Sequence, residues 1–269
     1  MKVQVLVATM GQNDFSKVKA MNISSDCIYA NQADRTDYSQ QEFDFGTVKM
    51  VTTQTRGVGI NRNMALLYAD GDYLLFSDDD LEYVSGYEKI VEQAFERLPR
   101  ADAIIFNVIT VGYDYGRRKN KKIKRIRWYN SFNYGAVRIA VRRNSVKREN
   151  IMFSTNFGGG TKFSAGEDTL FINSMLRKGL KIFTYPVVIA TVDQSTSTWF
   201  KGYNDKFYYD KGALFSAISK VWAKPLCLQY LIRHKQHKES GISFFRAYKL
   251  MKQGIKGYKT LREYSEQQG

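Results

Sequence analysis

The chain has 269 residues, and its 41 Lys and Arg side chains against 26 Asp and Glu give a formal charge of +15. Apolar residues make up 43% of the chain and aromatic residues 14%, which excludes a disordered or low-complexity protein. Its two cysteines are too few for a disulfide framework and indicate a reducing compartment.

The positive charge is confined to two parts of the chain. Residues 1–111 carry a net charge of −6 and residues 151–205 carry +1, whereas residues 112–150 carry +11 and residues 206–269 carry +9. A dedicated nucleic-acid binder seldom has an acidic first half, so we do not expect nucleic acid as a partner. The sequence has no membrane-spanning apolar stretch and begins like a strand rather than a signal peptide, which predicts a cytoplasmic protein.

Short apolar runs alternate with helical patterns in the first part of the chain. Strands are predicted at Val3–Ala8, Cys27–Ala30, Val48–Val51, Tyr73–Phe76 and Ala103–Val108, and helices at Ile60–Ala69 and from Ser85 to Leu98. This alternation predicts an α/β fold, with a mostly parallel central sheet flanked by helices.

The second part of the chain continues this pattern and then becomes helical. It predicts a basic loop or exposed hairpin from Asp114 to Arg127, strands at Gly135–Val141 and Lys181–Ile189, a helix at Thr169–Lys178, and helices rich in Tyr, Phe and Lys beyond Trp199. We therefore divide the chain into an α/β domain of residues 1–200 and a basic, aromatic-rich helical region of residues 201–269.

Three consecutive carboxylates, Asp78, Asp79 and Asp80, follow the apolar strand at Tyr73–Phe76. Ligands bind open α/β sheets beyond the carboxyl ends of the strands, and adjacent carboxylates that repel one another are stabilised by a cation. Their oxygens suit Mn²⁺ or Mg²⁺, which also bridge to phosphate. The alternative is an acidic turn that complements the dipole of the next helix; the strongly apolar strand favours metal binding.

Two other segments carry candidate chemistry. In Arg56–Asn63, glycines precede a helix N-terminus, where Arg62 and the backbone attract phosphate, although ordinary loop chemistry is the alternative. In Gly166–Thr169, Asp168 lies at a predicted helix start beside the glycine-rich segment 157–160. Its carboxylate can accept a proton from an attacking hydroxyl, or it can cap the helix.

The Arg62-Asn63 pair, the Asp-x-Asp motif and the Glu167-Asp168 pair together resemble the family 2 glycosyltransferases with the GT-A fold. The resemblance extends from Val3 to about Trp199. It implies a Rossmann-like GT-A domain that transfers a sugar by direct displacement, with inversion at the anomeric carbon.

The resemblance also implies site residues. The predicted donor-binding residues are Thr9, Met10, Asn31, Arg62, Asp78 and Asp79. The predicted metal ligands are Asp80, Asp78 and Asp193. Many GT-A enzymes have a histidine ligand where this chain has residues 190–195; either Asp193 takes its place or the metal keeps a water there. Asp168 is the predicted catalytic base, and the predicted acceptor contacts are Gly159, Gly160 and Glu167.

These observations predict an inverting, metal-dependent glycosyltransferase of the bacterial capsule and exopolysaccharide type. It would move a sugar from a nucleotide-sugar donor, a UDP-sugar in our interpretation, to a saccharide acceptor with the help of Mn²⁺ or Mg²⁺. Two alternatives remain: an RNA- or membrane-binding protein on an inactive GT-A scaffold, and a nucleotidyltransferase, which would leave Gly166–Thr169 unexplained.

The basic segments bear on the acceptor and on location. Eight cations lie between Arg117 and Arg127, followed by aromatic residues, and such a cluster binds a lipid diphosphate, an anionic membrane surface or nucleic acid, or forms a solvated loop. The hypothesis that follows is a lipid-diphosphate-linked acceptor, with the enzyme peripheral on the inner face of the cell membrane.

The end of the chain predicts a basic amphipathic helix. Its apolar stripe is Phe244, Tyr248, Met251, Ile255 and Tyr258, and Gly254 and Gly257 are expected to weaken the helix. Such a helix either lies on an anionic bilayer or packs its stripe on the catalytic domain. His234 and His237 are predicted to belong to a solvated basic face.

Overall fold

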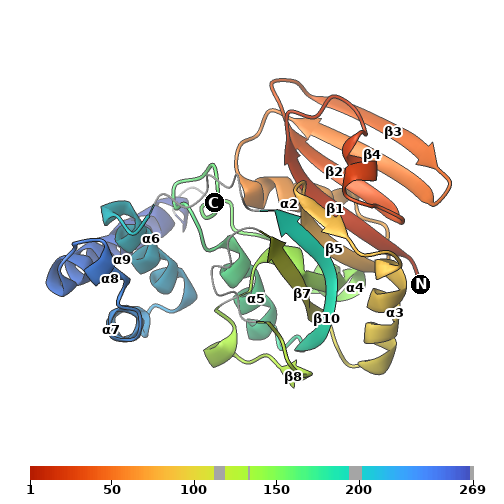
Figure 1. The fold of residues 1–269 in the computed structure, drawn as a ribbon. Coiled ribbons are helices and arrows are strands. Elements are labelled where there is room, and N and C mark those ends of the chain that lie inside the picture. Colours follow the sequence, from red (N-terminus) through yellow and green to blue (C-terminus); the bar gives the residue numbers. More distant parts are fainter. Residues whose placement is uncertain (112–118, 133, 194–201, 267–269) are drawn as a thin grey trace.

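A computed structural model describes residues 1–111, 119–132, 134–193 and 202–266. Within these ranges, ten strands form one sheet in the order β3-β4-β2-β1-β5-β9-β7-β10-β6, and β8 pairs with β10 (Figure 1). The strands are β1 Val3–Met10, β2 Asp26–Gln32, β3 Asp37–Phe43, β4 Gly46–Thr53, β5 Tyr73–Asp78, β6 Leu81–Tyr83, β7 Ala103–Val111, β8 Lys124–Arg125, β9 Ile139–Arg142 and β10 Ile182–Asp193.

The sheet is mostly parallel, as the alternating pattern predicted. Strands β4, β2, β1 and β5 are parallel neighbours, and β7 is parallel to β10. Strand β9 is antiparallel to both β5 and β7, so it separates two groups of strands that run in the same direction. The carboxyl ends of β1, β2 and β5 therefore meet at one edge of the sheet.

Two apolar layers cover the two faces of the sheet. The alternation of side chains along β1 sends Val5 and Val7 into one layer and Leu6 into the other. The first layer packs on α1 (Lys17–Ala20) and α3 (Tyr87–Arg97). The second packs on α2 (Val58–Tyr68), α4 (Arg143–Arg148) and α5 (Glu167–Arg177). This two-layered core fixes the strand ends that carry the predicted site.

Several segments differ from the sequence-based prediction, three of them in the sheet. Strand β3 was missed because it is a polar edge strand that pairs only with β4 and buries none of its residues. The strand predicted at Gly135–Val141 begins as a 3₁₀ turn, Ala136–Arg138, and only Ile139–Arg142 is extended. In the predicted basic loop, Lys124–Arg125 form a short strand, β8, while residues 114–118 lie outside the described residues.

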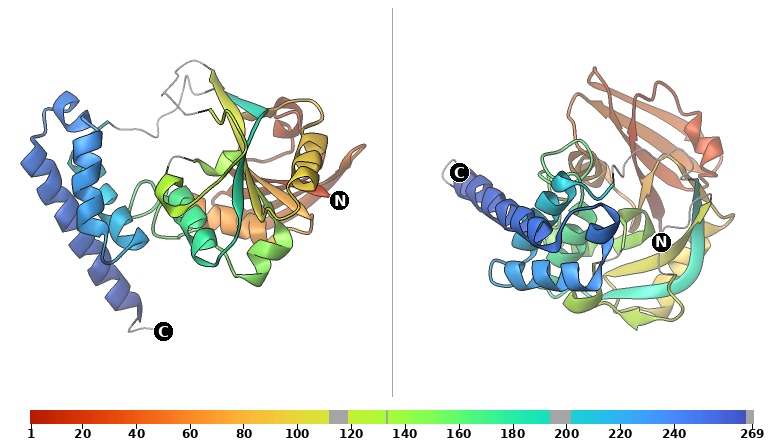
Figure 2. Two further views of the ribbon diagram at one scale, coloured as in Figure 1. Left: turned by 90° about the horizontal axis from the view of Figure 1, so that it is seen from below. Right: turned by 60° about the vertical axis from the view of Figure 1, so that its left-hand side comes forward.

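Four helices follow the sheet: α6 Asp205–Ile218, α7 Ala223–Arg233, α8 Gln236–Glu239 and α9 Phe244–Glu266. They form a separate layer beside α5 (Figures 1 and 2). A third apolar cluster joins α6, α7 and α9 to Phe157 and Phe163 of the loop before α5. The domain boundary predicted at residue 200 lies outside the described residues.

The apolar stripe of α9 is largely buried. Met251 and Ile255 are 0% and 5% exposed, and the Tyr258 ring lies 5.5 Å from that of Phe157. The expectation that Gly254 and Gly257 weaken this helix stays a prediction, but the structure shows a packing role for Gly254 that the sequence pattern did not indicate. A Cβ at Gly254 would overlap the carbonyl oxygen of Tyr209 on α6, so this glycine permits close packing of the two helices.

Candidate active site

A buried arginine joins the acidic end of β5 to the start of α5. Arg62 on α2 is 4% exposed. Its Nη2 donates to Asp78 Oδ1 at 2.8 Å, and its Nη1 donates to Asp168 Oδ1 at 2.8 Å and to Glu167 Oε1 at 3.1 Å. The guanidinium also lies 5.4 Å from the centre of the Phe153 ring. Three of the predicted motifs therefore meet in one cluster of ions.

The electrostatics of this cluster distinguish its members. Burial alone would lower the pKa of Arg62, but the carboxylates of Asp78, Asp168 and Glu167 raise it above its ordinary value, so Arg62 remains charged. Burial and the neighbouring Glu167 carboxylate raise the pKa of Asp168 to about 7, while Arg62 opposes the rise. A carboxylate with a pKa near neutrality is well matched to taking up a proton.

The three consecutive aspartates face different partners. Asp78 pairs with Arg62, whereas Asp79 accepts hydrogen bonds from Thr9 Oγ1 at 2.6 Å and Gln12 Nε2 at 3.4 Å. Asp80 has its pKa raised to about 6 by burial first and then by the charges of Asp78 and Asp79. Close carboxylates with this mutual repulsion are stabilised by a nearby positive charge.

A cavity of about 390 Å³ opens beside these carboxylates. Asp79, Asp80, Asp193 and Lys17 are among its lining residues. The strands explain this placement, because β10 carries Asp193 at its end and β6 pairs with β10 directly after Asp80. The structure thus brings two predicted metal ligands, Asp80 and Asp193, to one cavity.

These side chains offer the oxygen donors that a divalent cation prefers, and the repulsion at Asp80 fits a cation in this position. In the described ranges, however, no group of three or more His, Cys, Asp or Glu side chains is arranged to hold a metal. Asp78 is turned toward Arg62 instead. Metal binding by these residues therefore stays a prediction.

The residues predicted near the nucleotide lie at the ends of β1 and β2. Thr9 and Asn31 are paired in the β1–β2 register, and both are buried. Asn31 holds the turn after β1, because its side chain accepts from the backbone N–H of Gln12 at 3.0 Å and donates to the Gln12 carbonyl at 2.9 Å. Met10, at the end of β1, is 60% exposed.

The glycine-rich loop lies against the start of α2. The carbonyl of Gly159 accepts from the N–H of Val58 at 3.0 Å, and Gly160 has a φ of +79°, where an added Cβ would lie 3.2 Å from the backbone N of Gly57. A side chain at Gly160 would strain this contact. Glu167, predicted to contact the acceptor, is 9% exposed and pairs with Arg62, so it borders the base rather than open solvent.

Several residues of the site were not assigned from the sequence. Gln12 links Asn31 to Asp79, and Asn61 donates to the carbonyl of Thr9 at 3.1 Å. Asn63, quoted only as part of a motif, exchanges two hydrogen bonds with the Phe153 backbone, at 2.7 and 2.9 Å. Each of these residues carries a side-chain amide and lies close to a motif residue. Asn and Gln are equally common at polar positions without a function, so the sequence alone did not single them out.

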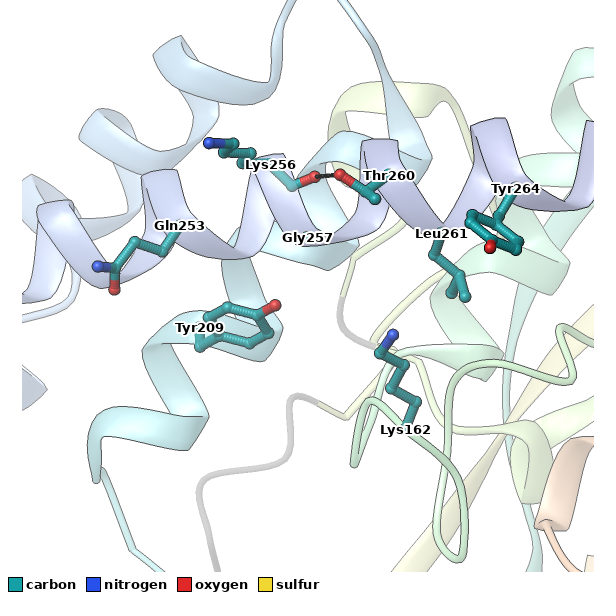
Figure 3. A pocket seen from close by; sticks show the side chains of 8 residues that line it. All are labelled: Lys162, Tyr209, Gln253, Lys256, Gly257, Thr260, Leu261 and Tyr264. Atoms are coloured by element: carbon teal, nitrogen blue, oxygen red, sulfur yellow. Dashed lines mark hydrogen bonds between the residues drawn. The ribbon is translucent and has the colours of Figure 1, made fainter.

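A larger cavity, of about 700 Å³, lies elsewhere, between α9, Tyr209 of α6 and Lys162 of the loop before α5 (Figure 3). It contains none of the predicted site residues. Figure 3 shows Lys162 reaching toward Leu261 of α9 from the opposite side. We therefore place the candidate active site at the smaller cavity and the Arg62 cluster.

Known structures share this fold. The crystal structure of S. aureus TarS 1–349 matches with a TM-score of 0.61 at 14% identity, covering 100% of this chain and 92% of that one. The same protein in complex with UDP matches with a TM-score of 0.60 at 14% identity and the same coverage. Its complex with UDP-GlcNAc matches at 0.56 and 15% identity, covering 88% and 72%.

At these identities the structural likeness shows the fold alone, and no curated protein matches the sequence. The sequence itself matches the model of the family described as glycosyl transferase family 2 over residues 27–168, which is more than half of the chain. The match runs from β2 through the acidic end of β5 to Asp168 at the start of α5. The chain therefore belongs to glycosyl transferase family 2 and is a glycosyltransferase with the GT-A fold.

Proposed function

We propose that this protein transfers a sugar from a UDP-sugar to a hydroxyl of a saccharide acceptor, with inversion at the anomeric carbon and with Asp168 as the base. The observation that carries the proposal is the buried Arg62, whose Nη1 binds the Asp168 carboxylate and whose Nη2 binds the Asp78 carboxylate. The S. aureus TarS structures with UDP and UDP-GlcNAc support a uridine nucleotide as the donor.

In this mechanism Asp168 takes the proton of the acceptor hydroxyl as the hydroxyl oxygen attacks the anomeric carbon. The bond between that carbon and the diphosphate oxygen breaks, and the nucleoside diphosphate leaves with the electron pair. General-base help of this kind contributes roughly 10²- to 10⁴-fold to the rate. Arg62 keeps the Asp168 carboxylate turned toward the site, and the backbone N–H of Ala136 also donates to it.

We propose Asp80, Asp193 and Asp78 as the ligands of Mn²⁺ or Mg²⁺. Such a cation neutralises the negative charge that develops on the leaving diphosphate. Thr9, Met10 and Asn31 lie at the strand ends where the donor nucleotide is proposed to bind, and Asp79 is fixed there by Thr9 and Gln12. Gly159 and Gly160 form the loop proposed to border the acceptor.

The acceptor proposed from the sequence is a surface polysaccharide precursor linked to a lipid diphosphate. In the basic segment, Arg117 and Arg118 lie outside the described residues, but Lys119, Lys121, Lys122, Lys124, Arg125 and Arg127 are all exposed. Trp128 and Tyr129 follow at 65% and 66% exposure. This exposed group of cations and aromatic rings supports an acceptor that carries phosphate.

The proposal is tested by thermal unfolding with UDP and Mn²⁺, each alone and together, followed by a screen of sugar nucleotides for UDP or GDP release. A ligand that binds only the native state raises the melting temperature. We expect the largest rise with both together. No rise at millimolar ligand would refute the enzyme and favour a binding protein on an inactive scaffold. Pyrophosphate as the product would favour a nucleotidyltransferase.

A further inference from the structure

Helix α7 is apolar on two opposite sides. Ala223, Cys227 and Leu231 are each at most 1% exposed and pack into the cluster that α7 shares with α6 and α9. On the other side, Leu228 is 42% exposed and Ile232 is 61% exposed, one helical turn apart. A helix that covers a core on one side ordinarily presents polar residues on the other.

The turn before α7 adds two exposed apolar side chains next to this helix. Val221 is 80% exposed and Trp222, which directly precedes the helix, is 64% exposed. Single exposed apolar residues are common on soluble proteins, but a contiguous group marks an interaction surface. We call Val221, Trp222, Leu228 and Ile232 the α7 face.

The charged side chains of the segment that carries the α7 face are all positive. Lys220, Lys224, Arg233 and Lys235 are exposed, and residues 219–238 contain no Asp or Glu. The absence of acidic residues from this segment is unusual even in a chain of net charge +15, because the chain contains 26 Asp and Glu residues, all of them outside the segment. A partner that fits this surface must provide both an apolar region for these side chains and negative charge for the surrounding cations.

We propose that the α7 face docks this enzyme on an anionic lipid bilayer. Interfacial helices combine Trp and Leu on one side with flanking Lys and Arg, and they lie in the plane of the headgroups. Trp prefers that interface, and cations next to it are attracted by acidic lipids. In the described parts of the chain no helix is long and apolar enough to cross a membrane.

The structure assigns this role to α7 rather than to α9, the helix that the sequence pattern singled out. The apolar stripe of α9 packs against the rest of the protein, because Met251 and Ile255 are buried against α6 and α7. His237, expected on a solvated face, is also buried at 6% exposure, with its ring 5.7 Å from that of Phe244. Within the described residues 202–266, the other exposed large apolar side chains are those of the α7 face and, on α9, Phe245 and Tyr264, which lie outside its predicted stripe.

The test is cosedimentation of the full chain with vesicles, at physiological salt. We expect retention on vesicles of phosphatidylglycerol and phosphatidylcholine, and at least about tenfold weaker retention on phosphatidylcholine alone. The double variant Leu228→Gln and Ile232→Gln should lose at least about tenfold in affinity for the mixed vesicles. Leu67→Gln is the matched control, since Leu67 on α2 is 69% exposed and should bind as the wild type.

Two charge-reversal variants distinguish a local contact of α7 with the bilayer from a general attraction of the positively charged protein to acidic lipids. Lys224→Glu and Lys89→Glu change the net charge equally, and both positions are exposed, but Lys89 lies on α3. We expect Lys224→Glu to weaken retention severalfold more than Lys89→Glu. Equal effects of the two variants, or retention of the Leu228/Ile232 variant as wild type, would overturn the proposal.

Two further measurements complete the test. Gel filtration with light scattering reports whether the α7 face joins two copies of the chain; a dimer that the Leu228/Ile232 variant abolishes would overturn membrane docking. The proposal does not depend on the sugar transferred. The rise in melting temperature with UDP and Mn²⁺ should be the same in the variant and the wild type, so failure of docking is distinguishable from failure of the proposed activity.

Discussion

Replacing Arg62 with methionine removes one charge from the centre of the site and keeps much of the side-chain volume. The side chain is 4% exposed, and its guanidinium lies over the Phe153 ring. Methionine can occupy this space, so the main change is the loss of the cation shared by Asp78, Glu167 and Asp168. The three carboxylates would then face one another without a counter-charge.

The expected loss of stability depends on how deeply each partner of Arg62 is buried. Removing one partner of a buried ion pair costs about 3–5 kcal/mol of stability. The side chain of Asp78 is 41% exposed and screened by water, whereas those of Glu167 and Asp168 are 12% and 25% exposed. We therefore take the lower end, about 3 kcal/mol, which corresponds to a fall in melting temperature of roughly 6–12 °C.

The assay is urea unfolding of the wild type and the Arg62→Met variant, followed by circular dichroism at pH 8 and pH 6. The pKa of Asp168 is already raised by burial and Glu167, and loss of Arg62 removes the charge that opposes the rise. The folded variant therefore binds protons more readily than its unfolded chain, so its stability increases as the pH falls. The deficit relative to the wild type should be smaller at pH 6.

The matched control is Arg56→Met. Arg56 pairs with Asp34, but these side chains are 54% and 94% exposed, so we expect no measurable loss of stability. The reasoning would be refuted by a loss below about 1 kcal/mol in Arg62→Met, or by a deficit that is the same at both pH values.

Four further predictions concern chemistry and packing. Asp168→Asn should lower turnover at least about 10²-fold while UDP still raises the melting temperature; near-normal turnover would assign the base elsewhere. In the wild type, kcat should fall as the pH drops below about 7, because burial and Glu167 raise the pKa of Asp168 and protonation removes the base; a flat profile from pH 6 to 8 would contradict this. Asp80→Ala should abolish the part of the UDP-induced rise that requires Mn²⁺, as calorimetry with and without chelator would report. Gly254→Ala should destabilise the protein by about 1–3 kcal/mol in thermal unfolding, because the new Cβ meets the Tyr209 carbonyl; helix propensity alone predicts the opposite sign.

Local sequence patterns were sufficient to predict the strands that consist of a continuous run of buried apolar residues. The segments at Val3–Ala8 and Tyr73–Phe76 became β1 and β5, extended by two residues each at their carboxyl ends. Strand β3 and the direction of β9 could not be obtained in this way. A polar edge strand has no core-facing pattern, and the direction of a strand depends on neighbours that are distant in the sequence.

The tail shows the same limit for an amphipathic helix. Its periodicity was read correctly, since α9 spans Phe244–Glu266. The pattern left open whether the stripe meets a bilayer or the rest of the protein, because both surfaces select for apolar side chains. Packing against α6 decided the question for the stripe of α9, whereas Leu228 and Ile232 of α7 are apolar positions that stay exposed.

The sequence by itself determined the fold class, the family and the three segments that carry the chemistry, because each is a local pattern of apolar period, glycine and carboxylate. Only the tertiary structure decided how those segments meet. Arg62 contacts Glu167 and Asp168 across 105 and 106 residues of chain, and it draws Asp78 toward the base. Such contacts depend on how helices pack on the sheet, which no local window of sequence records.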